Sequence, residues 1–157
     1  MRITRTIPLL TLFAAAGVLA TLAPAASRPA SHAALVIRHQ TVGCHSWSLN
    51  EGPSRVQQTV AIRRGGSVTV TNDDLMPHQL IETSGPPVTY TRLTLGGMTS
   101  RGGTYPPSML ARIGASSRIT FARAGVYRFT TKAGEDLMAN VKTVGPDNHL
   151  RLTVVVP

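Results

Sequence analysis

The only cysteine of the chain, Cys44, stands directly before His45, and a further histidine, His78, follows Pro77. Thiolates and imidazoles are common ligands of transition-metal ions. Each residue also has an ordinary structural role, because an unpaired cysteine is often a small buried apolar residue and His78 could be a turn residue. One cysteine excludes an internal disulfide and a metal cluster made of cysteines alone. Cys44 and His78 are therefore the first candidate metal ligands.

The sequence contains no motif typical of phosphate binding, of a nucleophilic serine or of a zinc protease. There is no Gly-rich loop ending in Lys-Ser/Thr, no Gly-x-Ser-x-Gly turn and no His-Glu-x-x-His pair. No independent acid/base pair is evident either. We therefore expect the chain not to be an enzyme, and a small copper oxidase ranks last among the functions considered.

The charge is strongly positive, with 16 Lys+Arg against 7 Asp+Glu and a formal net charge of +9. The basic residues are scattered singly, apart from Arg63-Arg64, and no aromatic residues alternate with them. A nucleic-acid footprint would need a cluster or a stripe of such residues, so we expect no nucleic-acid partner. We expect an acidic redox or copper-exchange protein as partner, attracted by long-range electrostatics.

The first residues resemble an export signal. Arg2 and Arg5 precede an apolar stretch over residues 7–22, and Ala23-Pro24-Ala25 offers small residues for a signal peptidase. An uncleaved membrane anchor is the alternative, because the stretch approaches the length of a membrane span. We expect a signal peptide over 1–25, a leader over 26–34 and a secreted or periplasmic location in the cell envelope, with no stable membrane span after cleavage.

Short runs of alternating apolar and polar residues, separated by Gly, Pro, Asn and Asp, predict β-strands over most of 35–157. No segment shows a sustained helical period. The predicted strands are Leu35–His39, Val56–Ile62, Ser67–Asn72, His78–Thr83, Arg118–Ala122, Val126–Thr131 and Leu150–Val156. The long Gly/Pro-rich connection at 84–116 could hold weak strands near Val88–Leu95 and Met109–Ile113 or form a functional flap. The pattern predicts an all-β domain, an antiparallel Greek-key β-sandwich.

Strand parity predicts which loops meet. If the first strand runs upward, residues 40–55 lie at the upper end, and a reversal at Gly65-Gly66 returns the chain to that end before His78. Cys44, His45 and His78 should then share one end of the sandwich. The loop over residues 132–143 joins them only if the strand Val126–Thr131 also runs upward.

Two segments resemble the cupredoxin family. The run from Val68 to Leu80 resembles the strand that ends in Asn, turns and presents the first copper-ligating histidine, here His78. The run from Ala124 to Phe129 resembles the Gly-x-Tyr-x-Phe strand before the second ligand loop, and Leu150–Val156 corresponds to the closing strand. The resemblance implies a cupredoxin-like sandwich with a copper cofactor.

The ligand pattern departs from that family. In its blue copper proteins Cys, His and Met follow the Tyr-x-Phe strand, but here these positions fall on Thr131, on Gly134 or Glu135, and on Met138. Of the family's ligands, His78 and Met138 are matched. The predicted metal ligands are therefore Cys44, His78 and Met138, with Glu135 as a possible oxygen ligand and His45 in reserve.

The function that follows is an exported copper-binding protein with a relocated cysteine ligand, acting in electron transfer or copper carriage. The alternative is a metal-free β-sandwich interaction module of the cell envelope. The remaining histidines, His32, His39 and His149, have no neighbouring motif and are interpreted as surface residues. Trp47 either shields the site from water or closes the end of the sandwich.

Overall fold

The computed structural model describes residues 28–39, 45–97, 104–133 and 150–157. Over these residues the chain forms strands and no helix, and therefore no apolar helix that could cross a membrane. The strands are β1 Ala30–His39, β2 His45–Leu49, β3 Ser54–Arg55, β4 Gln57–Asp73, β5 His78–Ser84, β6 Thr89–Leu95, β7 Met109–Leu110, β8 Ala115–Thr120, β9 Gly125–Lys132 and β10 Arg151–Val156.

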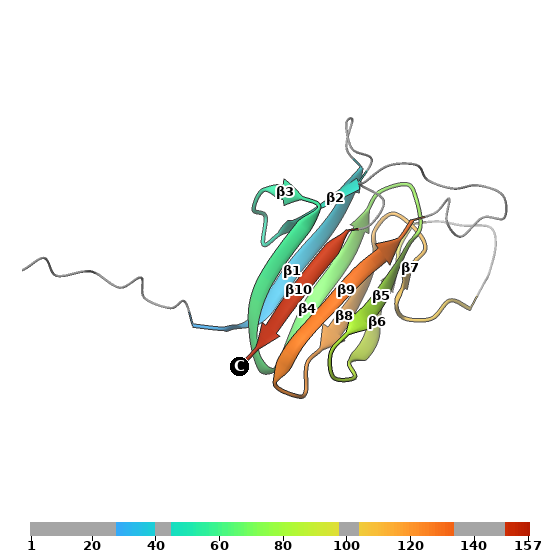
Figure 1. Ribbon diagram of the computed structural model, residues 1–157. Coiled ribbons are helices and arrows are strands. Elements are labelled where there is room, and N and C mark those ends of the chain that lie inside the picture. The colour runs from blue at the N-terminus through green and yellow to red at the C-terminus, as the bar shows by residue number, and fades with distance from the viewer. Residues whose placement is uncertain (1–27, 40–44, 98–103, 134–149) are drawn as a thin grey trace, which may run out of the picture.

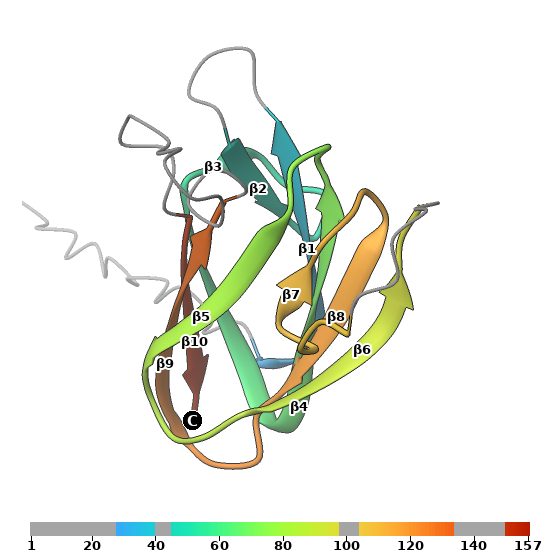
Figure 2. The ribbon, with the colours of Figure 1, turned by 90° about the vertical axis from the view of Figure 1, so that its right-hand side faces the viewer.

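The strands form two layers that face each other across an apolar core (Figure 2). One layer contains β3, β2, β1, the second half of β4, β8 and β6. The other contains the first half of β4, then β10, β9, β5 and β7. This confirms the predicted all-β sandwich. The sheet is mixed rather than wholly antiparallel, because β4 pairs in parallel with both β1 and β10.

The bend in β4 explains both parallel pairings. The chain reverses its direction near Gly65-Gly66, at the bottom of the view in Figure 1, as the sequence predicts. Gly65 has φ +77°, a left-handed conformation that favours glycine. A Cβ on Gly66 would lie 2.6 Å from the Ile62 side chain and 2.7 Å from the Ser31 carbonyl oxygen, so only glycine fits there.

Alternation along the strands places the apolar side chains between the layers. On β9, Tyr127 and Phe129 are buried while Arg128 between them is exposed, and both rings pack edge-to-face against Phe121. Trp47 of β2 is also fully buried in this core. The alternation of apolar and polar residues in the sequence therefore matches the alternation of buried and exposed side chains along the strand.

Several boundaries differ from the predicted ones. β1 begins at Ala30, so the last five residues of the predicted leader belong to a strand. β2 and β3 lie within residues 40–55, where the sequence predicts a loop. The connection at 84–116 contains β6 and β7, close to the two weak strands expected there. Burial of Ser46 and Ser48 on β2 explains why its hydrophobic pattern is hard to see.

A first prediction concerns Tyr90 on β6. Burial and the nearby Glu82 carboxylate raise the pKa of Tyr90 from 10.0 to about 12. The unfolded chain therefore releases the phenolic proton at lower pH than the folded protein does. The stability that depends on the neutral phenol is complete below about pH 10 and is lost as the pH rises toward 12, by about 1–2 kcal/mol for this partly exposed group.

Denaturant unfolding of the parent and of Tyr90→Phe through this alkaline range measures that loss. The parent should lose more stability than the variant, because phenylalanine carries no titrating proton. Parallel curves for the two proteins would contradict the prediction.

Candidate metal centre

Three histidines and one aspartate lie together at one end of the sandwich. β1 ends at His39, β2 begins at His45, and the two residues are directly paired across the antiparallel ladder. β5 begins at His78, and Asp74 lies in the turn that connects β4 to β5. These four residues are called the His-Asp cluster below.

The Asp74 carboxylate is the centre of the cluster. Its Oδ2 lies 3.0 Å from Nε2 of His45 and 3.0 Å from Nε2 of His78. Its Oδ1 lies 3.8 Å from Nδ1 of His39 and accepts a hydrogen bond from the Met76 backbone amide. The rings of His45 and His78 are nearly perpendicular, with centroids 4.8 Å apart. One carboxylate thus contacts imidazoles from three strands.

Burial differs within the cluster. The side chains of His45, Asp74 and His78 are at most 1% exposed, whereas that of His39 is 55% exposed. Burial alone would raise the pKa of the Asp74 carboxyl. The hydrogen bonds from His78 and the Met76 amide, together with the charges of His78 and His45, outweigh burial and hold that pKa below its ordinary value. Asp74 is therefore ionised at neutral pH.

An ionised carboxylate only accepts hydrogen bonds, which fixes the tautomer of His78. Its Nε2 must carry the proton that is donated to Asp74. In the neutral ring, Nδ1 then keeps a lone pair, and this buried atom has no hydrogen-bond partner within the described residues. Metal-binding histidines commonly have this arrangement: one ring N–H donates a hydrogen bond to a carboxylate, and the other nitrogen offers its lone pair to the metal.

The turn that carries Asp74 is held by Asn72. Its side-chain amide donates to the backbone carbonyls of Met76 at 2.8 Å, Leu110 at 3.2 Å and Arg112 at 3.2 Å. Its Oδ1 accepts from the Asp74 backbone N–H at 3.0 Å. Asn72 is fully buried, so these bonds fix the turn from β4 to β5 against the segment that contains β7.

We therefore predict that Asn72→Asp destabilises the protein by about 2–4 kcal/mol, because it removes the hydrogen bonds donated to three carbonyl groups and places a buried carboxylate beside those oxygens. The variant keeps the size of the side chain and its accepting oxygen, so the loss reports the missing donors together with the carboxylate that replaces them. Urea unfolding of the two proteins measures it. A change below about 0.5 kcal/mol, typical of a surface substitution, would contradict this role of Asn72.

The structure does not test the predicted ligand set, but it shows where two of its histidines lie. His78 lies at the expected end, and the expected neighbour of Cys44, His45, lies against it. Cys44, Glu135 and Met138 lie outside the described residues. β9 ends at Lys132, which pairs with Gln79 next to His78. β9 therefore runs toward the end of the sandwich that carries His78, which is the direction that the sequence analysis required for residues 132–143 to begin there.

Two members of the cluster were not expected from the sequence. His39 is exposed, as the sequence predicts, and its ring also lies 5.8 Å from that of His45 in an edge-on contact. Asp74 is one of two adjacent aspartates in a turn-forming run, and such residues are normally solvated. The short separation of His39 and His45 in the sequence was the available signal, since paired antiparallel strands can place such residues opposite each other.

Several solved structures are similar to this chain at low identity. A purple cupredoxin from Nitrosopumilus maritimus has 18% identity and a TM-score of 0.38, covering 77% of this chain and 97% of that one. An inclusion body protein from Burkholderia cenocepacia has 10% identity and a TM-score of 0.41, covering 83% and 98%. A cysteine protease inhibitor from Entamoeba histolytica has 11% identity and a TM-score of 0.38, covering 64% and 86%.

No family model and no curated protein matches the sequence. TM-scores as low as those above carry no argument about function, and the β-sandwich rests on the strand pairing itself. What the chain offers for a functional argument is the His-Asp cluster at one end of that sandwich.

Proposed function

We propose that this chain is a non-catalytic copper-binding protein whose metal site is the His-Asp cluster. The observation that supports this most is the buried Nδ1 of His78, a nitrogen without a hydrogen-bond partner within the described residues, on a ring whose Nε2 is bound to Asp74. A buried polar atom without a partner is costly, and a metal ion at that nitrogen would remove the cost.

The donor set supports copper. Because Nε2 of His78 faces Asp74, an ion at Nδ1 of His78 lies on the opposite side of that ring. One ligand atom from each of His39, His45 and Asp74 lies within 4.8 Å of the others, so these three residues form the alternative position for the ion. Imidazole suits copper, zinc, iron and nickel, and a thiolate or thioether would move the preference toward copper. Cys44 directly precedes His45 in the chain, and its thiolate remains a predicted ligand, as do Met138 and Glu135.

The frame around the cluster suits either electron transfer or copper carriage. Bound copper would supply a one-electron change between its two common oxidation states. The paired ends of β1 and β2, together with Asn72, fix the positions of the histidines, and Asp74 orients two of their rings. His39 leaves one side of the cluster open to solvent, as exchange of electrons or of the ion requires.

Copper titration of the purified, metal-free chain tests the proposal. We expect one ion per chain, with nitrogen couplings from histidine in the electron paramagnetic resonance spectrum of the Cu(II) form. Comparison with Cys44→Ser shows whether the thiolate contributes, since its absorption band would then disappear. Absence of stoichiometric binding would overturn the proposal and leave a metal-free interaction module.

We also propose that the protein is exported, because of the signal-like residues at its start. Mass spectrometry of the protein from the growth medium and from the cell envelope tests this. A chain that begins after residue 25 is the expected result, and a full-length chain retained inside the cell would contradict it.

A further inference from the structure

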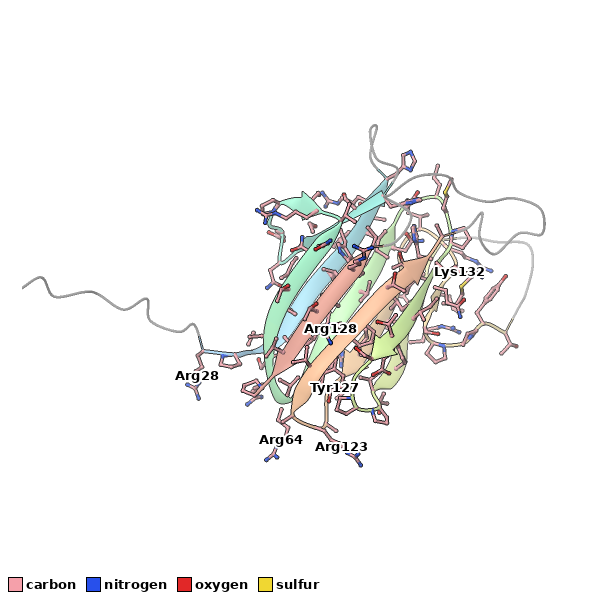
Figure 3. All side chains as sticks on the ribbon, in the orientation of Figure 1. Arg28, Arg64, Arg123, Tyr127, Arg128 and Lys132 are labelled. Carbon is pink, nitrogen blue, oxygen red and sulfur yellow. The ribbon has the colours of Figure 1, made fainter. Side chains whose placement is uncertain are left out.

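The fold gathers arginines that are far apart in the sequence at the end of the sandwich opposite the His-Asp cluster. The chain enters β1 at this end, β4 bends there, and the turn between β8 and β9 lies beside the bend. These segments carry four exposed arginines, called the basic end below: Arg28, Arg63, Arg64 and Arg123. Figure 3 shows Arg28, Arg64 and Arg123 along the lower end of the molecule.

No acidic residue compensates for this charge within the described part of the chain. The segments that form this end are residues 28–31, 63–66, 85–88 and 122–125, and they contain neither Asp nor Glu. None of the four arginines forms an ion pair with a residue that the structure describes. Asp73 and Asp74 lie at the other end of the sandwich. The domain is therefore polarised, with a positive potential at the basic end.

The backbone holds the arginines in one surface. The hydroxyl of the fully buried Tyr127 donates a hydrogen bond of 2.6 Å to the Arg123 carbonyl oxygen. The Gly65 amide donates to the Phe121 carbonyl oxygen at 2.7 Å, which fixes the bend of β4 against the turn that carries Arg123. The charges therefore occupy fixed places relative to one another, and little order has to be gained when they bind.

The sequence before the basic end indicates that a lipid surface lies next to it. Residues 7–22 form an apolar stretch, and only five residues separate this stretch from Arg28. Even a fully extended chain spans at most about 20 Å between residues 22 and 28. Whenever the apolar stretch lies in a bilayer, during export or as an anchor, the basic end must therefore lie close to the lipid headgroups.

Exposed apolar side chains lie beside the arginines. Val126 of β9 and Val155 of β10 are direct cross-strand partners and are 42% and 37% exposed. Basic and aliphatic side chains together suit the boundary between lipid headgroups and acyl chains. The four segments named above contain no aromatic residue that could stack on a base, so a nucleic acid is less well matched.

We propose that the basic end binds a membrane surface that contains anionic phospholipid. The guanidinium groups donate hydrogen bonds to the lipid phosphates, and the two valines contact the apolar boundary. This orientation directs the His-Asp cluster away from the membrane, so that the exposed His39 faces the aqueous compartment. Each arginine near an anionic surface contributes about fivefold to the affinity.

The test uses the metal-free chain from residue 26, because residues 7–22 would bind any bilayer through their apolar side chains. This chain contains every described strand and the whole core. Arg63→Gln/Arg64→Gln/Arg123→Gln alters the basic end. The control, Arg55→Gln/Arg118→Gln/Arg151→Gln, removes the same charge from exposed positions elsewhere. Circular dichroism shows that each variant keeps its strands.

Binding is measured by sedimentation with vesicles of phosphatidylcholine, with and without phosphatidylglycerol. We expect the parent to bind only the anionic vesicles, and more weakly as salt rises. The basic-end variant should lose at least about 30-fold in affinity and the control less than about threefold. Equal losses in the two variants would show that net charge alone attracts the protein, and would overturn the proposal. Absence of binding by the parent would do the same.

The orientation is tested with an environment-sensitive fluorophore at either end of the sandwich. In a Cys44→Ser background, Ala124→Cys places the dye at the basic end, and Leu75→Cys places it in the exposed turn that carries Asp74. Anionic vesicles should shift the emission of the first dye to shorter wavelength and leave the second unchanged. Equal shifts at both positions would contradict the proposed orientation. Neither measurement requires copper, so both test the basic end separately from the metal site.

Discussion

Replacing His45 and His78 together by glutamine is expected to lower the copper affinity by more than about 100-fold. Loss of an outer hydrogen-bond partner alone costs metal sites about 10–100-fold, and here two nitrogen donors would be removed. Glutamine keeps a polar group near Asp74, which favours a folded variant. Competition with a chromophoric copper chelator measures the affinity of parent and variant.

His32→Gln provides the matched control. His32 lies near the other end of β1, where its Nδ1 is 3.0 Å from the Ser67 hydroxyl. This control should bind copper as the parent does. The far-ultraviolet circular dichroism spectrum shows whether each variant keeps its strands. A folded His45/His78 variant with the parent's affinity would place any copper elsewhere and contradict the proposed site.

Replacing Asp74 by alanine is expected to destabilise the metal-free protein by about 3–5 kcal/mol. The substitution removes two buried contacts of 3.0 Å to His45 and His78. Breaking a buried charged network by removing one member typically costs this much, because the remaining groups stay buried without a partner. Urea unfolding at neutral pH, followed by circular dichroism, gives the free energy of unfolding.

The neighbouring residue supplies the control for Asp74. Asp73 is about half exposed, and it lies 3.6 Å from the exposed guanidinium of Arg38. Asp73→Ala should change the stability by less than about 1 kcal/mol, as for other exposed ion pairs. If Asp74→Ala does not fold, Asp74→Asn keeps an accepting oxygen and should show a smaller loss. Equal effects at Asp73 and Asp74 would contradict the central role of Asp74.

The sequence was sufficient to place His45 and His78 at the same end of the fold. Alternation at Val68 and Val70, and at Tyr127 and Phe129, identifies strands, and the glycines at 65 and 66 mark the reversal between two of them. Counting strand directions then determines which loops meet. This reasoning needs only local patterns and the alternation of strand direction, so it succeeds without knowledge of packing.

The same reasoning could not find Asp74. Its neighbour Asp73 has the same side chain but is exposed, and the difference arises from the Asn72 hydrogen bonds and from the positions of His45 and His78. The contact of Asp74 with His45, and those that hold Asn72 to Leu110 and Arg112, join residues far apart in the chain, so no local pattern records them. The strand β2 was missed for a related reason, since its serines are buried along with its Trp47.

The bend of β4 couples the unfolding of the two layers. Its first half is hydrogen-bonded to β10 and its second half to β1 and β8, so one covalent segment belongs to both sheets. Loss of the strand pairing of β4 in one sheet therefore disturbs its hydrogen-bonded pairing in the other. Opening of the sandwich should therefore be a single cooperative event, in which hydrogen exchange of the backbone amides in both halves of β4 reports the same free energy of opening.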